Sequence, residues 1–291
     1  MTHLDPERDT ERDSDRYTVP GLERGLRILL EFSRDEPTLT APELARRLGV
    51  PRSTVFRLLV TLENMGFVER TPDGRSHRLG LAVLRLGFEY LASLGIVELG
   101  RPLLEGLRDA SGYSASLVVR DAREVVYLVR SAPRSPFATT VSVGTRLPAH
   151  ATVLGHVLLG DLSLAALRTL YPESRLEHFT AHTPQTVQQL FEVVQRTRGQ
   201  GWVLAEGYFE PQICTVAAPV REGSGHIVAA IGLTVPGPAI ADDQRERLVA
   251  LVRGATAELS ARLNYRDDAP APASPATAVS AVARPDPRAR R

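Results

Sequence analysis

The chain has 291 residues and a formal net charge of +1, and 43% of its residues are hydrophobic. This composition is typical of a globular protein with one large or two moderate domains, and it lacks the overall basic charge of many nucleic-acid-binding chains. The single cysteine, Cys214, excludes an intrachain disulfide, and no apolar run is long enough to span a bilayer. We therefore expect a cytoplasmic protein with no membrane partner.

Both ends of the chain are predicted to be disordered. Residues 1–18 alternate charges with almost nothing to bury, and residues 266–291 form a tail of alanine, proline, arginine and aspartate. Segments of this composition cannot bury enough apolar surface to fold. The folded part of the chain is thus expected between these two tails.

A winged helix-turn-helix is predicted for residues 19–80. Its first helix is expected to end near Ser33 and carries the leucines Leu22, Leu26, Leu29 and Leu30. Two amphipathic segments separated by Gly49 follow, and two short strands then surround an Asp-Gly turn. The ranges of these four elements are 40–48, 51–62, 66–70 and 75–79. A helix, a tight turn, a second helix and a wing form an arrangement that reads duplex DNA.

The segment 51–62 has the properties of a recognition helix. At 100° per residue its apolar residues share one face, which must be core: Val55, Leu58, Leu59 and Leu62. We expect Arg57 and Arg52 to read guanine, and Ser53 and Thr54 to bind phosphates from the helix N-terminus. Arginines of the preceding helix and the wing would meet the DNA backbone. The predicted DNA-binding residues are Arg46, Arg47, Arg52, Ser53, Thr54, Arg57, Arg75 and Arg78.

Residues 81–95 are predicted to form a linker helix that pairs two subunits. Its apolar residues follow heptad spacing, with steps of three, four and three: Leu81, Leu84, Phe88 and Leu91. So short a seam cannot sustain a free coiled coil, but it can pair subunits that other contacts already hold together. The alternative is an ordinary helix packed on its own domain.

The remaining segment, residues 96–265, alternates strand-like and helical stretches. Strands are expected at 115–120, 124–130, 138–143, 202–205, 214–220 and 227–235. Helices are expected at 99–110, 151–159, 164–170, 184–198 and 242–263. Hairpins with helices at both ends predict an α+β fold, in which helices flank an antiparallel sheet.

Five stretches resemble the IclR-type bacterial transcriptional regulators. They read LERGLRIL (22–29), LARRLGVPRSTVFRLL (44–59), GFVER (66–70), VGTRLPAHATVLG (143–155) and CTVAAPV (214–220). The resemblance implies a winged helix, a linker helix and a GAF-like effector domain in homodimers or homotetramers on double-stranded operator DNA. It also implies a small organic acid as effector. Family members include repressors and activators, and an activator would also contact RNA polymerase.

A narrower resemblance concerns residues 86–94 and 142–149. These are similar to the branch of the family that controls aromatic-acid catabolism, such as the protocatechuate and hydroxybenzoate regulators. This branch implies an aromatic acid as effector and a catabolic operon as target.

The effector is expected to bind around the loop 147–152, whose mostly small residues lead into a helix N-terminus that favours an anion. The resemblance implies that the segment around this loop forms one wall of the site and that two later strands form the facing wall. The predicted effector-binding residues are Leu147, Ala149, His150, Ala151, Thr152, Gly155, Glu206, Cys214, Gly232 and Thr234. Many family members have an aspartate where this chain has Ala205, with Glu206 next to it. The loss of this polar group favours a larger or aromatic ligand.

Two other functions compete with this interpretation. One is an enzyme with Cys214 as nucleophile and His150 as base, but no activating motif surrounds the cysteine, and a small apolar-strand thiol is usually core. The other is an architectural DNA-binding protein that needs no ligand, which would leave the second domain without a role. The histidines lack the i,i+4 carboxylate pairing of a zinc helix. We therefore expect no metal, no cofactor and no enzymatic activity.

Overall fold

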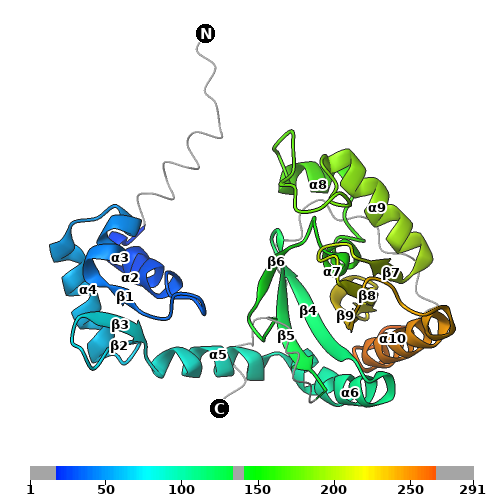
Figure 1. Ribbon diagram of the computed structural model, residues 1–291, viewed down its shortest axis with the longest axis horizontal. Coiled ribbons are helices and arrows are strands. Elements are labelled where there is room, and N and C mark those ends of the chain that lie inside the picture. The colour runs from blue at the N-terminus through cyan, green and yellow to red at the C-terminus, as the bar shows by residue number, and fades with distance from the viewer. Residues whose placement is uncertain (1–17, 134–140, 267–291) are drawn as a thin grey trace, which may run out of the picture. The chain divides into compact units, whose positions relative to one another are not determined.

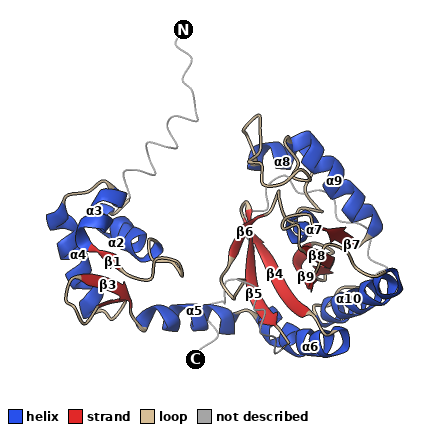
Figure 2. Ribbon diagram, viewed as in Figure 1, coloured by secondary structure: helices blue, strands red, loops and turns tan. Residues whose placement is uncertain are grey.

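The computed structural model describes residues 18–133 and 141–266 and divides the chain into two compact units, Met1–Ser93 and Leu94–Arg291 (Figure 1). Apart from Thr18 and Arg266, the tails predicted to be disordered lie outside the described residues. Both units contain helices and strands (Figure 2), which confirms the α+β fold class. In this described part, no helix has the length and apolar character needed to cross a membrane.

The first unit combines helices with a three-stranded antiparallel sheet of order β1-β3-β2. Its elements are α2 (Pro20–Leu30), β1 (Leu39–Thr40), α3 (Ala41–Leu48), α4 (Arg52–Asn64), β2 (Val68–Arg70), β3 (Ser76–Leu79) and α5 (Ala82–Ser93). The predicted helix-turn-helix and both wing strands are confirmed. The sequence pattern does not predict β1, whose two residues extend the wing sheet by pairing with β3.

Local signals in the sequence set the bounds of α3. Thr40 and Glu43 form a capping box, in which the Thr40 hydroxyl accepts from the Glu43 amide and the Glu43 carboxylate accepts from the Thr40 amide. Gly49 ends the helix in the left-handed region at a φ of 65°, a conformation that glycine adopts without strain. The chain then enters α4 within two residues.

The core of the first unit lies where α2, α3 and α4 meet. Ile28 of α2, Leu44 of α3 and Val55 and Leu59 of α4 are at most 1% exposed. The predicted core face of α4 is confirmed for Val55, Leu59 and Leu62, whereas Leu58 is only partly buried.

The first helix differs from the prediction at its C-terminus. It ends at Leu30, three residues before Ser33. Leu22, Leu26 and Leu30 are 62%, 53% and 82% exposed, because the helix turns Gly25 and Ile28 toward the core instead. Three of its four leucines therefore lie on the surface of the unit.

The last helix of the first unit, α5, has no buried residue. Leu81, Leu84 and Phe88 of the predicted seam are 75%, 54% and 65% exposed, and Leu91 is half-buried. The seam is thus uncovered in the single chain.

The second unit is built on a six-stranded antiparallel sheet of order β6-β5-β4-β9-β8-β7. The strands are β4 (Ser114–Asp121), β5 (Glu124–Ser131), β6 (Arg146–Pro148), β7 (Val203–Glu206), β8 (Ile213–Arg221) and β9 (Ile227–Pro236). The helices are α6 (Gly95–Ser111), α7 (Val153–Leu158), α8 (Leu164–Leu170), α9 (Val187–Gln200) and α10 (Asp242–Arg262).

Helices cover both faces of this sheet. A Cβ added at Gly100 of α6 would meet Leu117 of β4 and Leu259 of α10, which places α6 and α10 on one face. A Cβ added at Gly232 of β9 would meet Leu154 of α7, which places α7 on the other face, with α8 and α9 beyond it (Figure 1). We call the side under α7 the α7 face.

Two predicted elements of the second unit differ from the structure in extent. The strand expected at 138–143 is not formed at residues 141–143, and residues 138–140 lie outside the described part; the strand of this region is β6. The helix expected at 151–159 begins only at Val153, because Thr152 caps it with its hydroxyl, which accepts from the Gly155 amide.

Candidate functional sites

The outward surface of α4 is polar and open. Ser53, Arg57, Thr61 and Asn64 are exposed opposite the buried face, and Phe56 between them is 57% exposed. The Thr61 hydroxyl donates to the Arg57 carbonyl oxygen, so it lies along the helix. Arg57 thus places a cationic side chain at the centre of the exposed surface of α4.

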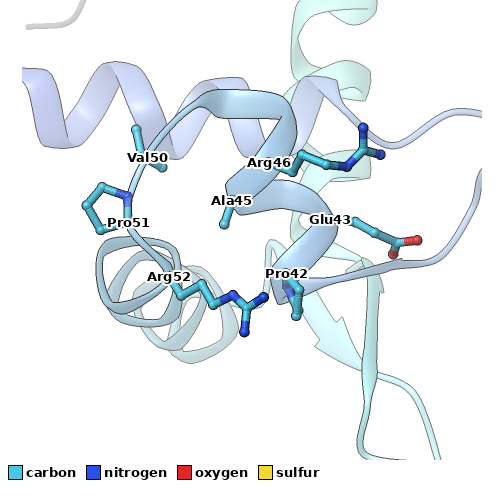
Figure 3. A pocket seen from close by; sticks show the side chains of 7 residues that line it. All are labelled: Pro42, Glu43, Ala45, Arg46, Val50, Pro51 and Arg52. Carbon is cyan, nitrogen blue, oxygen red and sulfur yellow. The ribbon is translucent and has the colours of Figure 1, made fainter.

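The N-terminus of α4 carries no side-chain cap, in contrast to α3, because the side chain of Pro51 at the N-cap position has no hydrogen-bonding group. A shallow groove adjoins this end, and Figure 3 shows Arg52 extending from the start of α4 toward Pro42. The residues lining it are Pro42, Glu43, Ala45, Arg46, Val50, Pro51 and Arg52. Uncapped amides beside arginines attract an anion such as a DNA phosphate.

Ion pairs separate the predicted DNA-binding arginines into two groups. Arg47 donates to both carboxylate oxygens of Glu36, at 3.0 and 2.7 Å, and Arg78 bonds Glu69 at 3.0 Å. Within the described ranges, Arg46, Arg52, Arg57 and Arg75 form no ion pair, and all four are exposed. The second group keeps its donors available to DNA, whereas the first is engaged inside the unit.

In the second unit, strand pairing brings small and hydroxyl-bearing residues together on the α7 face. Ser116 of β4 pairs with Gly232 of β9, which pairs with Ala217 of β8. Because side chains of directly paired residues lie on one face, the contact of Gly232 with Leu154 places this whole row under α7.

A second row lies two residues further along the strands. Ser114 pairs with Thr234, Thr234 with Thr215, and Thr215 with Ala205. No hydrogen bond joins the hydroxyl of Thr215 or Thr234 to another residue of the described part, and both residues are partly exposed. Three hydroxyl groups on adjacent strands therefore face the same side as the loop before α7.

The loop before α7 is buried and held by its own side chains. Ala149 and Ala151 are fully buried, and Gly155 admits no side chain, since an added Cβ would lie 2.0 Å from the Ala149 carbonyl oxygen. The Thr152 hydroxyl donates to Pro148 at 3.1 Å while it caps α7. Leu147 is part of β6 and packs on the core below α7.

Both histidines near this loop have structural partners. Nε2 of His150 lies 2.9 Å from the Glu177 carbonyl oxygen, and Nε2 of His156 lies 2.8 Å from the His150 carbonyl oxygen. Complete burial lowers the pKa of His156 to about 4, so its ring is neutral. Among the described residues, no group of three His, Cys, Asp or Glu side chains is placed to hold a metal ion.

Two predicted effector-binding residues lie on the other face of the sheet. Glu206 and Cys214 pair with each other, one residue out of step with Ala205 and Thr215. Glu206 accepts from Arg245 of α10 at 2.7 Å and from the Ile240 amide at 2.8 Å. The structure therefore brings Gly232 and Thr234 together with Thr215 and Ala205, and not with Cys214 and Glu206.

The residues that sequence reasoning missed on the α7 face are Ser114, Ser116 and Thr215. Side chains alternate between the two faces of a strand, so the prediction of Cys214 instead of Thr215 selected the face opposite to Gly232 and Thr234. The small residues Ala217 and Gly232 were the sequence signal for this face, because small side chains on a strand allow a helix to pack close to the sheet.

The geometry does not support a nucleophilic pair of Cys214 and His150. The Cys214 thiol is fully buried, donates to the Gly237 carbonyl oxygen at 3.2 Å and lies on the face away from α7, whereas His150 is on the α7 side. Burial raises the pKa of the Cys214 thiol, which opposes formation of the thiolate.

Comparison with known proteins agrees with both units. Residues 21–72 match the family model of the IclR helix-turn-helix domain, and residues 88–261 match that of the bacterial transcriptional regulator IclR C-terminal domain. The Pca regulon regulatory protein of Pseudomonas putida is 30% identical over 84% of each chain. The regulator XynR of Escherichia coli K12 is 28% identical over 85% of this chain and 98% of its own.

Solved structures show the same fold. A putative transcriptional regulator from Rhodococcus sp. RHA1 has a TM-score of 0.74 at 29% identity and covers 84% of this chain and 98% of its own. An IclR homologue from Microbacterium hydrocarbonoxydans, complexed with 4-hydroxybenzoate, has a TM-score of 0.73 at 25% identity with the same coverage. The chain therefore belongs to the IclR family of ligand-responsive, DNA-binding transcriptional regulators, which are not enzymes.

Proposed function

We propose that α4 reads operator DNA through Arg57, with Arg46, Arg52 and Arg75 on the DNA backbone or adjacent bases and Ser53 and Thr54 on phosphates. The observation that carries this proposal is the exposed polar surface of α4 next to its uncapped N-terminus. Arg47 and Arg78 take a smaller part, because they are bonded to Glu36 and Glu69.

The test begins with selection of binding sites from a random duplex library by the wild-type protein. Arg57→Ala is then expected to lose about 1–3 kcal/mol of binding to the selected duplex and to relax specificity at one base pair. Arg253→Ala, which removes an exposed arginine from α10 in the second unit, is the matched control and should bind as wild type does. Equal binding by Arg57→Ala would remove Arg57 from the reading set.

We further infer that the effector is an aromatic acid that binds on the α7 face and that the regulated genes belong to a catabolic operon. Three observations support this: the Pca regulon regulator among the relatives, 4-hydroxybenzoate in a structural homologue, and the apolar side chain of Ala205 in the second row. The proposed binding residues come from the two rows and from the buried loop: Ala149, Ala151, Ser114, Ser116, Ala205, Thr215, Gly232 and Thr234.

Thermal-shift measurements test this assignment. A ligand at one hundred times its Kd stabilises the protein by about 2.7 kcal/mol, which is readily seen. 4-Hydroxybenzoate or protocatechuate is expected to raise the melting temperature more than glyoxylate or pyruvate. Tighter binding of either small oxoacid would contradict the assignment.

The protein is proposed to act as a homodimer, which can pair into a tetramer. The seam of α5 and the surface leucines of α2 are apolar and exposed in the single chain, as expected of surfaces that a second copy covers. In this proposal residues 19–80 bind DNA, residues 81–95 pair the subunits, and residues 96–265 bind the effector.

A further inference from the structure

The inference concerns Arg130, near the end of β5. Strand β5 contains a bulge opposite Leu117 and Val118 of β4, where Val118 pairs with Tyr127 but Leu117 pairs with Val129. Leu128 thus has no partner of its own in this ladder. A bulge of this kind changes which side chains of a strand face each side of the sheet.

The side that Arg130 faces follows from its neighbours. Tyr127 and Val118 pack in the core under α7, whereas Leu117 lies where a side chain added at Gly100 of α6 would be, on the opposite face. Val129 is paired with Leu117 and therefore shares its face. Side chains alternate along a strand, so the next residue, Arg130, lies on the α7 face because of the bulge. Without the bulge, Arg130 would share a face with α6.

Register and hydrogen bonding place Arg130 beside both rows. It pairs with Ser116, which continues the first row to Arg130, Ser116, Gly232 and Ala217. Its Nη2 atom donates to the Ser114 hydroxyl at 3.2 Å, and Ser114 begins the row of hydroxyl groups that continues through Thr234 and Thr215.

The guanidinium is partly desolvated at this position. Arg130 is half-buried, and this burial lowers its pKa, although the group keeps its charge. A guanidinium fork matches a carboxylate in two parallel hydrogen bonds.

We propose that Arg130 binds the carboxylate of the effector and thereby makes the site select acids over neutral analogues of the same shape. The inference rests on the proposed function, since it assigns a specificity-determining residue to the same site. The Ser114 hydroxyl positions the guanidinium, and the Thr215 and Thr234 hydroxyls remain for polar substituents on the far side of the ligand.

Calorimetric titration tests the proposal with two ligands of nearly equal shape, 4-hydroxybenzoate and the neutral 4-hydroxybenzamide. The wild-type protein is expected to bind the acid at least about 10-fold more tightly. Arg130→Gln should weaken binding of the acid by about 10- to 100-fold and leave binding of the amide nearly unchanged. Arg120→Gln is the matched control, because Arg120 is also a partly buried arginine but lies at the end of β4 away from Ser114 and Ser116.

The outcomes separate this inference from the function on which it rests. If Arg130→Gln binds the acid as wild type does, the role of Arg130 is overturned and the aromatic-acid assignment stands. If the wild-type protein binds neither ligand, the role of Arg130 and the aromatic-acid assignment are both overturned. Arg130→Lys covers the case in which Arg130→Gln fails to fold: it should prefer the acid over the amide but bind it more weakly than wild type, and unchanged affinity would overturn the inference.

Discussion

Arg245 and Glu206 are joined by a hydrogen-bonded ion pair of 2.7 Å on the side of the sheet away from α7. The pair links α10 to β7, and the Ile240 amide donates to the same carboxylate oxygen. These two bonds fix the start of α10 against the sheet.

Glu206→Gln is expected to reduce the free energy of unfolding by about 1 kcal/mol, because removal of the negative charge weakens the partly exposed bonds from Arg245 and the Ile240 amide. Ligand affinity should remain that of wild type. Thr215→Val, on the α7 face, should show the reverse: weaker ligand binding with little change in stability. Chemical denaturation and calorimetry of the two variants check both expectations, and a loss of ligand affinity in Glu206→Gln would contradict the placement.

His156 predicts a dependence of stability on pH. Its pKa is about 4 in the folded protein, because burial disfavours the charged ring, and about 6.5 in the unfolded chain. The unfolded chain therefore takes up a proton first as the pH falls below 6.5, and stability is lost progressively until the pH reaches about 4. The loss from this group is about 3 kcal/mol.

The measurement is the free energy of unfolding of wild type and His156→Gln between pH 7 and pH 4. Carboxylates destabilise both proteins alike at acid pH, so the difference between the two curves isolates His156. The variant is expected to be less stable at pH 7 and to approach wild type as the pH falls. Parallel curves would show that His156 takes up no extra proton on unfolding.

Two glycines, Gly155 within α7 and Gly232 beneath it, should respond differently to the same substitution. Gly155→Ala places a methyl group against the backbone of Ala149, which cannot move without opening the buried loop, and the expected loss exceeds about 3 kcal/mol. Gly232→Ala meets the end of the Leu154 side chain, which can rotate, so its loss should stay near about 1–2 kcal/mol. Thermal unfolding of both variants gives the comparison, and an equal or larger loss in Gly232→Ala would contradict it.

The exposed seam of α5 predicts the effect of charge on assembly. Leu84→Glu and Phe88→Glu each place a carboxylate in the apolar surface that we propose to be covered by a second copy. Both should shift the protein toward the monomer in light scattering coupled to gel filtration, whereas Arg85→Glu, off the seam, should not. Monomeric wild-type protein would rule out this dimer.

Elements with strong local signals were predictable from the sequence. The helix-turn-helix is such a case, since the capping box of Thr40 and Glu43, the turn at Gly49 and the apolar face with Val55 lie within about twenty residues. The strands of the second unit were also largely found, because turn residues separate their apolar runs.

The positions on the α7 face were not predictable, because they depend on pairing between distant strands. Thr215 rather than Cys214 faces α7 as a result of its register with Thr234, and Arg130 does so because of a bulge opposite Val118. Neither the register nor the bulge can be predicted from the sequence of one strand alone. The exposure of Leu22 and Leu26 was not predictable for a related reason, since an apolar stripe on the surface has the same spacing as one that faces the core.

The most direct test of the central claim is the affinity of the wild-type protein for its selected duplex, measured by fluorescence anisotropy with and without 4-hydroxybenzoate. We predict that the ligand changes the Kd for this duplex at least about 5-fold, the lower range of coupling between two linked sites. An unchanged Kd at a ligand concentration that raises the melting temperature would contradict the claim that effector binding controls DNA binding.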